Sequence, residues 1–371
     1  MRLKIRVLLL ADPGSYHTIK WANALSKKGI EIFIFGLSGY NLETYKSINV
    51  TVYSEGLNSS IFKMRDGAFS KSIYLKTIPK LNRYIKRINP DIIHAHYASS
   101  YGFLGTLTRF HPYIISAWGS DVYDFPRSSV INKYIFKYNL RNADIILSTS
   151  NIMAKEISKY TSKEIVITPF GIDTEKFKPE KVESFFNEDD VVIGTVKLLE
   201  KQYGIEYLLH AFSILKKDLK EFNIKLLIVG SGTEEEKLKK MADELNIQKD
   251  TVFTGFIPND DVPRFFNMMS IAVFPSIKES FGVSALEANA CQIPVVVSDA
   301  PGFTETIENE VNGLITRKGD IKSLTSAVKS LITNNELRIK LGESGRDIVV
   351  KKYLLKDNIE LMSNIYNKLL S

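Results

Sequence analysis

The chain contains one cysteine, Cys291, and no apolar run close to the length of a membrane span. A lone cysteine excludes an internal disulfide framework and fits a reducing compartment, while a membrane-spanning helix needs about 20 mostly apolar residues. The basic and apolar start is interrupted by Arg6 and ended by Asp12, which predicts a buried first strand rather than a signal peptide. We therefore expect a cytoplasmic protein, and contact with the inner face of the cytoplasmic membrane stays open.

Low-complexity segments and short repeats are also lacking, and the sequence instead alternates short apolar runs with helical patterns. This alternation predicts parallel strands joined by crossover helices. The expected strands, rich in Val and Ile as buried parallel strands are, cover residues 5–10, 30–35, 91–94, 113–117, 144–148, 165–168, 191–196, 225–229, 252–254, 271–274, 294–298 and 313–316. The chain has 371 residues, of which 44% are hydrophobic and 25% charged. We therefore predict an α/β fold with two Rossmann-like domains.

Turn residues mark the expected domain boundary. The stretch 169–173, Pro-Phe-Gly-Ile-Asp, followed by Pro179, is typical of a linker. We expect an N-terminal domain over 1–170, a C-terminal domain over 171–350, and a helix over 351–371 that packs back on the N-terminal domain. Ligands of open parallel sheets bind at the carboxyl ends of the strands, so two sheets that face each other predict a central cleft.

Acidic residues are scarce in the first half of the chain. Residues 1–170 contain 23 Lys and Arg against 11 Asp and Glu, a net charge of +12, whereas residues 171–371 contain 26 against 31, a net charge of −5. The densest basic stretch, 61–90, combines one acid, Asp66, with the cations Lys63, Arg65, Lys71, Lys76, Lys80, Arg83, Lys86 and Arg87 and the aromatics Phe62, Phe69, Tyr74 and Tyr84. Either a solvated helix face or docking to anionic lipid explains it, each nearby cation contributing about 1 kcal/mol. Without a nucleic-acid module we expect no nucleic-acid partner.

The segment 274–288 is the most informative, with the sequence Phe-Pro-Ser-Ile-Lys-Glu-Ser-Phe-Gly-Val-Ser-Ala-Leu-Glu-Ala. A loop of small residues leads into a run of good helix formers over 284–290. The backbone N–H groups around Ser280, Phe281, Gly282 and Val283 would then point out of a helix N-terminus. Free donors and the helix dipole make such an end an anion site, for which a diphosphate is the natural occupant.

Glu279 and Glu287 flank this expected anion site. On one helix, eight residues correspond to a rise of about 12 Å, more than the roughly 5–9.5 Å between the two carboxylates of a glycosidase. The pair therefore suits the two ends of a long ligand, with sugar hydroxyls at Glu279 and ribose hydroxyls at Glu287. Glu279 can also lie in the loop, which leaves the distance open.

This segment resembles the Glu-seven-residues-Glu motif of glycosyltransferase family 4. Further segments resemble the family's in the same order along nearly the whole chain, and segment 12–25 resembles the first strand-to-helix loop of a polysaccharide-synthesis subgroup. The other matching segments are 91–102, 118–122, 169–173, 230–232 and 301–305.

The resemblance implies a GT-B fold, with an acceptor-binding first domain and a nucleotide-sugar-binding second domain. It implies a retaining, hexosyltransferase-type transfer from a nucleotide diphosphate donor, by default a UDP-sugar, to a glycan or lipid-linked glycan of a surface polysaccharide or glycolipid. No bound metal or other cofactor is implied. The diphosphate would depart and the acceptor attack the same face, so the enzyme's task is to stabilise the leaving phosphates electrostatically.

For that task the family usually shows an Arg and then a Lys. Here Lys197 stands in the place of the Arg, and Lys201 falls one residue before the usual position, which Gln202 occupies. We expect Lys197 and Lys201 to contact the phosphates, with Gly230 and Gly14 also on the donor side.

A second departure from the family concerns histidine. Many relatives carry a His just before the Gly of the segment at 118–122, where this chain has Trp118. His96 or His94 can compensate, because alternate residues of a strand share one face, or Trp118 can stack on an acceptor sugar. We take His96 as the catalytic candidate. On the acceptor side we place four residues, namely Ser15, His17, Trp118 and Asp121.

Two other functions stay open at this point. A nucleotide-sugar 2-epimerase of the same fold would convert the donor without any acceptor. An inactive nucleotide-sugar-binding protein would keep the binding residues without turnover.

Overall fold

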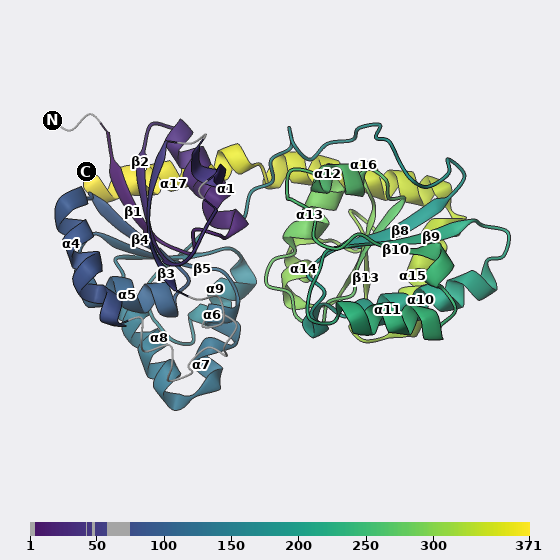
Figure 1. The fold of residues 1–371 in the computed structure, drawn as a ribbon, viewed down its shortest axis with the longest axis horizontal. Coiled ribbons are helices and arrows are strands. Elements are labelled where there is room, and N and C mark those ends of the chain that lie inside the picture. The colour runs from purple at the N-terminus through teal and green to yellow at the C-terminus, as the bar shows by residue number, and fades with distance from the viewer. Residues whose placement is uncertain (1–3, 42, 47–48, 58–74) are drawn as a thin grey trace. The chain divides into compact units, whose positions relative to one another are not determined.

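The computed structural model describes residues 4–41, 43–46, 49–57 and 75–371, and the chain divides into two compact units. Unit 1 comprises Met1–Pro169 and Lys356–Ser371, and unit 2 comprises Phe170–Leu355. Each unit is an α/β domain built on one parallel sheet, as the alternation of apolar runs and helical patterns predicts (Figure 1).

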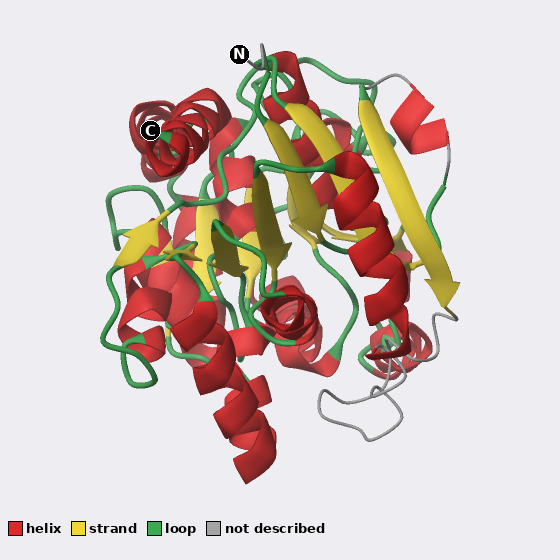
Figure 2. Cartoon of the chain, turned by 90° about the vertical axis from the view of Figure 1, so that its left-hand side faces the viewer, coloured by secondary structure: helices red, strands yellow, loops and turns green. Residues whose placement is uncertain are grey.

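The sheet of unit 1 has the strand order β3-β2-β1-β4-β5-β6-β7, and every pair of neighbours is parallel. Helices cover both of its faces (Figure 2). The strands are β1 (Arg6–Leu10), β2 (Glu31–Ser38), β3 (Val50–Leu57), β4 (Ile92–His96), β5 (Tyr113–Ala117), β6 (Ile145–Ser148) and β7 (Ile165–Ile167). The helices are α1 (Tyr16–Lys27), α2 (Glu43–Lys46), α4 (Ile78–Ile88), α5 (Ser100–Thr108), α6 (Ser120–Tyr123), α7 (Phe125–Ser128), α8 (Val130–Asn142), α9 (Asn151–Ile157) and the terminal α17 (Leu355–Leu370).

The sheet of unit 2 has the order β10-β9-β8-β11-β12-β13, again parallel throughout. Its strands are β8 (Val191–Val196), β9 (Ile224–Val229), β10 (Thr251–Phe253), β11 (Ile271–Phe274), β12 (Val295–Ser298) and β13 (Leu314–Thr316). The helices are α10 (Ile205–Asp218), α11 (Glu235–Glu244), α12 (Val262–Phe266), α13 (Val283–Ala290), α14 (Pro301–Thr306), α15 (Ile321–Thr333) and α16 (Asn335–Lys352), with 3-10 turns at Lys201–Tyr203 and Gln248–Asp250.

All twelve strands expected from the sequence are present, most within two residues of the predicted bounds. The strand missed is β3, which pairs only with β2 at the edge of the sheet. Its residues are exposed or half-buried throughout. The sequence therefore lacks, at this position, the continuous apolar run from which a buried strand is predicted.

The predicted start of the terminal helix, residue 351, is wrong. Lys352 ends α16, and α17 starts only at Leu355. Between them the backbone pairs with Ile172, whose N–H donates to the Tyr353 carbonyl (2.7 Å) and whose carbonyl accepts from the Leu355 N–H (3.0 Å). This pairing with a residue far away in the sequence uses the groups that a continuous helix would need, which local helical periodicity cannot reveal.

Candidate active site

Two neighbouring strands of unit 2 bring together the charged groups predicted to act on a donor. β8 and β11 lie side by side in the sheet, so the residues after their carboxyl ends meet at one edge. Lys197 follows β8 directly, and Glu279 lies in the loop between β11 and α13. The Lys197 Nζ is 2.6 Å from the Glu279 Oε2, with both side chains nearly buried, at 12% and 11% exposed.

The second oxygen of Glu279 faces the N-terminal end of α13. Glu279 Oε1 accepts hydrogen bonds from the backbone N–H of Ser280 (3.2 Å) and of Gly282 (3.3 Å). Gly282 has a φ of 89°, a left-handed conformation that glycine adopts readily. The Glu279 carboxylate thus sits among an ammonium group and two amides, in the position where the sequence predicts an external anion.

Lys197 keeps its positive charge despite its burial. Burial alone lowers the pKa of its ammonium, but the nearby carboxylates of Glu279 and Glu287 outweigh that effect, and the pKa lies above its usual value. The ammonium also lies 4.6 Å from the centre of the Tyr203 ring, a favourable cation–π distance. Lys197 is therefore a cation at neutral pH.

The two glutamates do not share a helix. Glu279 lies in the loop, whereas Glu287 is on α13 and 5% exposed, so the rise of one helix does not set their separation. Both nevertheless act electrostatically on Lys197. Phe281, expected to offer its N–H at this end of α13, has its side chain buried in unit 2 and packed edge-on against Phe170 and Tyr353.

Two glycines allow the backbone segments around these side chains to approach closely. A Cβ on Gly230, which has a φ of 132°, would lie 2.0 Å from the Lys197 carbonyl oxygen. A Cβ on Gly302 would lie 2.4 Å from the Phe281 nitrogen, and the Gly302 N–H donates to the Glu279 carbonyl (3.0 Å). Gly302 was not predicted as a site residue, although its segment, 301–305, was among those that resemble the family.

Lys201 is in a different setting from Lys197. It lies exposed on the 3-10 turn Lys201–Tyr203, and no contact of the described residues brings it to Glu279. The carbonyl of the neighbouring Gln202 accepts from the N–H groups of Ile277 and Lys278 (2.8 and 3.3 Å). Through these hydrogen bonds the turn fixes the position of the loop that leads to Glu279.

In unit 1, the ring of the catalytic candidate His96 and the two rings expected on the acceptor side, those of His17 and Trp118, gather at the carboxyl ends of β1, β4 and β5. The His96 ring, at the end of β4, lies 4.3 Å from the Trp118 ring. The His17 ring, on α1, meets Trp118 edge-on at 5.9 Å. His96 is 3% exposed, its Nδ1 has no hydrogen-bond partner among the described residues, and burial holds its pKa well below the usual value. A neutral imidazole therefore lies against an indole.

Asp121 holds the loop that carries Trp118. Its carboxylate accepts from the backbone N–H groups of Ala98 (2.7 Å), Gly119 (2.7 Å) and Trp118 (3.2 Å), and the side chain is fully buried. Burial raises its pKa to about 6, and the backbone N–H donors act in the opposite direction. Asp121 therefore positions Trp118.

Gly14 and Ser15 belong to a tight turn after β1. The Gly14 N–H donates to the Asp12 Oδ1 (3.0 Å) and the Ser15 N–H to the Asp12 carbonyl (3.1 Å). The backbone N–H groups of Gly14 and Ser15, which the sequence predicts to face a ligand, are thus both hydrogen-bonded to Asp12. Ser15 is the residue directly before α1, which begins with Tyr16 and carries His17.

His94 shares the face of β4 with His96, their rings 4.9 Å apart, but it belongs to the core. Its Nδ1 lies 2.7 Å from the Tyr366 hydroxyl of α17, and its Nε2 lies 2.7 Å from the Ser116 hydroxyl of β5. Burial lowers its pKa to about 3. His94 is therefore a neutral, hydrogen-bonded core residue rather than a ligand-facing one.

This burial predicts a pH dependence of stability. Between pH 6.5 and about 3 the unfolded chain binds a proton at His94 that the folded chain does not, so its contribution to the free energy of unfolding falls as the pH falls through this window. In His94→Gln the slope should be smaller by up to about 1.4 kcal/mol per pH unit. The opposite contribution of Asp121 and that of His96 stay present in both proteins.

Tryptophan fluorescence during urea unfolding at pH 7, 6, 5 and 4.5 measures this slope. Both tryptophans of the chain, Trp21 and Trp118, are buried in unit 1, so the signal reports the unit that contains His94. Equal slopes in the two proteins would contradict a neutral, buried His94.

The basic stretch 61–90 falls partly outside the described residues, which exclude 58–74. On α4, Lys80 is paired with Glu55 of β3 (2.9 Å), whereas Arg83, Lys86 and Arg87 are exposed. Within the described part of the chain no helix is long and apolar enough to cross a membrane. Among the described residues, no group of three or more His, Cys, Asp or Glu side chains lies close enough together to hold a metal ion.

Comparisons with known proteins match both units. The family model described as Glycosyl transferase 4-like matches residues 6–150, and that described as Glycosyl transferases group 1 matches residues 176–348. An uncharacterized glycosyltransferase of Methanocaldococcus jannaschii is 27% identical over 89% of this chain and 90% of its own length. The capsular polysaccharide biosynthesis glycosyltransferase CapM of Staphylococcus aureus is 27% identical over 93% of this chain and 92% of its own.

Solved structures show the same fold at low identity. Sucrose-phosphate synthase from Thermosynechococcus elongatus superposes with a TM-score of 0.84 at 19% identity, covering 99% of both chains. Anabaena HepE, solved in complex with UDP-glucose, has a TM-score of 0.79 at 16% identity, covering 98% of this chain and 100% of its own. The predicted GT-B fold, with one parallel sheet in each of two domains, is thereby confirmed.

Proposed function

This chain belongs to the glycosyltransferases of family 4, with the GT-B fold, and we propose that it transfers a sugar from a nucleoside diphosphate donor to a glycan or lipid-linked glycan, with retention of configuration. Unit 2 binds the donor and unit 1 the acceptor. The product belongs to a surface polysaccharide or glycolipid, which the similarity to CapM supports. UDP is the proposed nucleotide, supported by the UDP-glucose complex of HepE.

The observation that carries this proposal is the carboxylate held between Lys197 and the start of α13. One ammonium and two backbone N–H groups already surround an anion there, and that anion is the chain's own Glu279. A pyrophosphate presents the same kind of oxygen atoms with more charge, so it can replace the carboxylate on these donors. Glu279 is then released to hydrogen-bond the sugar hydroxyls, and Glu287, with its buried carboxylate, faces the nucleoside end.

This arrangement accounts for the chemistry without a covalent enzyme intermediate. Charge develops on the leaving diphosphate, and the Lys197 ammonium with the amides of Ser280 and Gly282 stabilises it in a site that largely excludes water. The acceptor attacks the face that the diphosphate leaves. On the acceptor side, we assign the acceptor hydroxyl to His96, whose buried Nδ1 has no hydrogen-bond partner among the described residues, and the acceptor sugar to the neighbouring Trp118 ring.

A thermal-shift panel tests the donor site. A nucleoside diphosphate sugar at 100 times its dissociation constant should stabilise the protein by about 2.7 kcal/mol, and the matching nucleoside, which lacks the phosphates, should stabilise it far less. If no nucleoside diphosphate or its sugar raises the melting temperature more than the nucleoside does, the proposed donor site is wrong.

Analysis of the donor sugar after incubation without acceptor separates transfer from epimerisation. Incubated with UDP-GlcNAc alone, a transferase leaves the configuration at C2 of the sugar unchanged. Appearance of the C2 epimer without acceptor would assign the chain to the epimerases instead.

A further inference from the structure

Helix α8 of unit 1 exposes an unusual apolar face. Val130 and Ile131 are each 71% exposed, Tyr134 is 69% exposed and Tyr138 is 46% exposed. Ile131, Tyr134 and Tyr138 follow the spacing i, i+3, i+7, which places them along one side of the helix. The opposite side packs into the core through Phe136 and Leu140, both fully buried. The exposed side chains Val130, Ile131, Tyr134 and Tyr138, called the stripe below, are therefore not needed to pack α8 onto unit 1, because the opposite side of the helix already makes that contact.

The charges beside this stripe have one sign. The cations of α8 are Lys133, Lys137 and Arg141, all three exposed, and the helix contains no Asp or Glu. Neither lysine forms an ion pair with any residue that the structure describes. Exposed aliphatic and tyrosine side chains between unpaired cations are typical of a helix that lies in a membrane interface, where Lys stems follow the apolar surface and their ammonium groups reach the phosphates.

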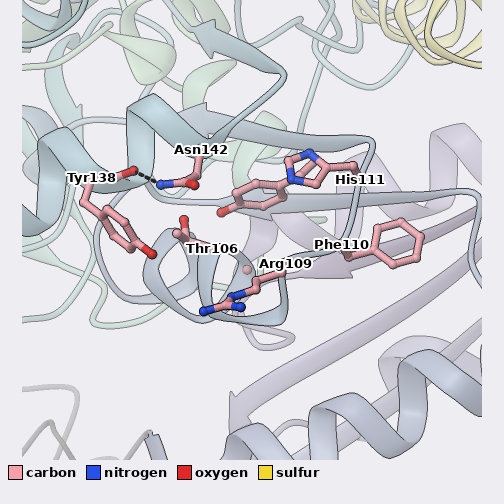
Figure 3. Close-up of a pocket in the computed structure, with 8 residues that line it drawn as sticks. Thr106, Arg109, Phe110, His111, Tyr138 and Asn142 are labelled. Atoms are coloured by element: carbon pink, nitrogen blue, oxygen red, sulfur yellow. Dashed lines mark hydrogen bonds between the residues drawn. The ribbon is translucent and has the colours of Figure 1, made fainter.

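A small pocket lies at the end of the stripe. It has a volume of about 220 Å³, and its lining includes Arg109, Phe110, His111, Tyr113 and Tyr138. Figure 3 shows the Tyr138 ring and the Arg109 side chain on the same side of the pocket, with the Phe110 ring pointing away from them. Tyr138 thus belongs both to the stripe and to the pocket.

The charge and size of this pocket suit a headgroup. Arg109 is exposed and forms no ion pair with the described residues, while His111 is paired with Asp144 (2.7 Å), which also accepts from the Tyr113 N–H. The volume is below the roughly 300 Å³ at which sites for larger ligands begin. A single phosphate-bearing headgroup therefore fits better than a nucleotide sugar.

We propose that the α8 face of unit 1, namely Val130, Ile131, Tyr134, Tyr138 and their flanking cations, docks on an anionic phospholipid bilayer. The pocket beside Arg109 receives the phosphate of one lipid. A second copy of the chain is a poor occupant, because a two-fold contact would set the same lysines against each other. Helix α4, on which Arg83, Lys86 and Arg87 are exposed, belongs to the row α4, α5, α8 of unit 1, in which each helix contacts the next (Figure 1).

Co-sedimentation with vesicles tests this surface, using the whole chain and no sugar nucleotide, so that the result does not depend on the proposed transfer. Wild type should bind vesicles of phosphatidylglycerol and phosphatidylcholine, and bind pure phosphatidylcholine at least tenfold more weakly, since each cation near the surface contributes about 1 kcal/mol. Ile131→Ser with Tyr134→Ser should lower binding to the anionic vesicles about 10–100-fold, because two interfacial side chains lose their apolar contact.

Matched controls come from unit 2. Phe256 and Ile339 are 74% and 50% exposed, and Phe256→Ser with Ile339→Ser should leave vesicle binding unchanged. Arg109→Gln should weaken binding to anionic vesicles about fivefold. Circular dichroism melts confirm that the variants fold. The proposal is overturned if folded wild type does not bind anionic vesicles, or if the α8 variant binds them as wild type does.

Discussion

Replacing Lys197 with methionine should lower the rate of sugar transfer by about 10²–10³-fold, the usual cost of losing one preorganised donor to a developing negative charge. Methionine keeps most of the length of the lysine side chain but none of its charge. The ammonium lies 2.6 Å from the Glu279 Oε2, and the amides of Ser280 and Gly282 donate to the Oε1 of the same carboxylate. The substitution therefore removes the positive charge that we expect to stabilise the leaving pyrophosphate most.

A steady-state assay of donor consumption with acceptor measures this effect, and Lys225→Met provides the matched control. Lys225, on β9 of unit 2, likewise forms a short ion pair, 2.6 Å from Asp250, and Lys216 pairs with the other oxygen of Asp250. The control should retain transfer. If Lys197→Met is as active as the control, Lys197 does not stabilise the leaving diphosphate.

Replacing Glu279 with glutamine should separate donor binding from turnover. The variant loses the carboxylate proposed to hold the sugar, so transfer should fall by about 10²–10³-fold. Affinity for the free nucleoside diphosphate should rise instead, because no competing anion then occupies Lys197 and the α13 amides. Isothermal titration of the diphosphate together with a transfer assay distinguishes these two effects. Loss of both binding and turnover would contradict the exchange of carboxylate for phosphate.

Stability provides an independent check on the same pair. Glu279→Gln leaves the Lys197 ammonium buried without its principal carboxylate, a change that destabilises by about 3–5 kcal/mol in comparable buried pairs. Combining it with Lys197→Met removes both charges and should recover most of that loss without recovering transfer. A double-mutant cycle on unfolding free energies gives the coupling between the two side chains. Glu234→Gln, which breaks the exposed pair with Lys237 (2.8 Å), should change neither stability nor transfer appreciably.

The sequence by itself determined the class of fold and much of the strand arrangement. Runs such as 113–117, 191–196 and 271–274 are apolar, short and bounded by turn residues, and each is a strand with the predicted bounds. Their burial is a property of local composition, so it can be read without tertiary information. The edge strand β3 lacks that property, and the separation of α16 from α17 depends on the distant Ile172.

The tertiary structure decided which of the candidate residues meet. Lys197 and Lys201 were both expected to contact the phosphates, and both follow β8. Lys197, directly at the end of the strand, is paired with Glu279 because β8 lies beside β11, whereas Lys201 is exposed on the 3-10 turn. Strand order is not encoded in local sequence. The same reason separates His94 from His96: both point to one face of β4, but it is His94 whose ring nitrogens are hydrogen-bonded to the hydroxyls of Ser116 and Tyr366. Local patterns specify the elements, whereas parallel pairing across long stretches of chain sets which side chains share an environment, and hence their charge and chemistry.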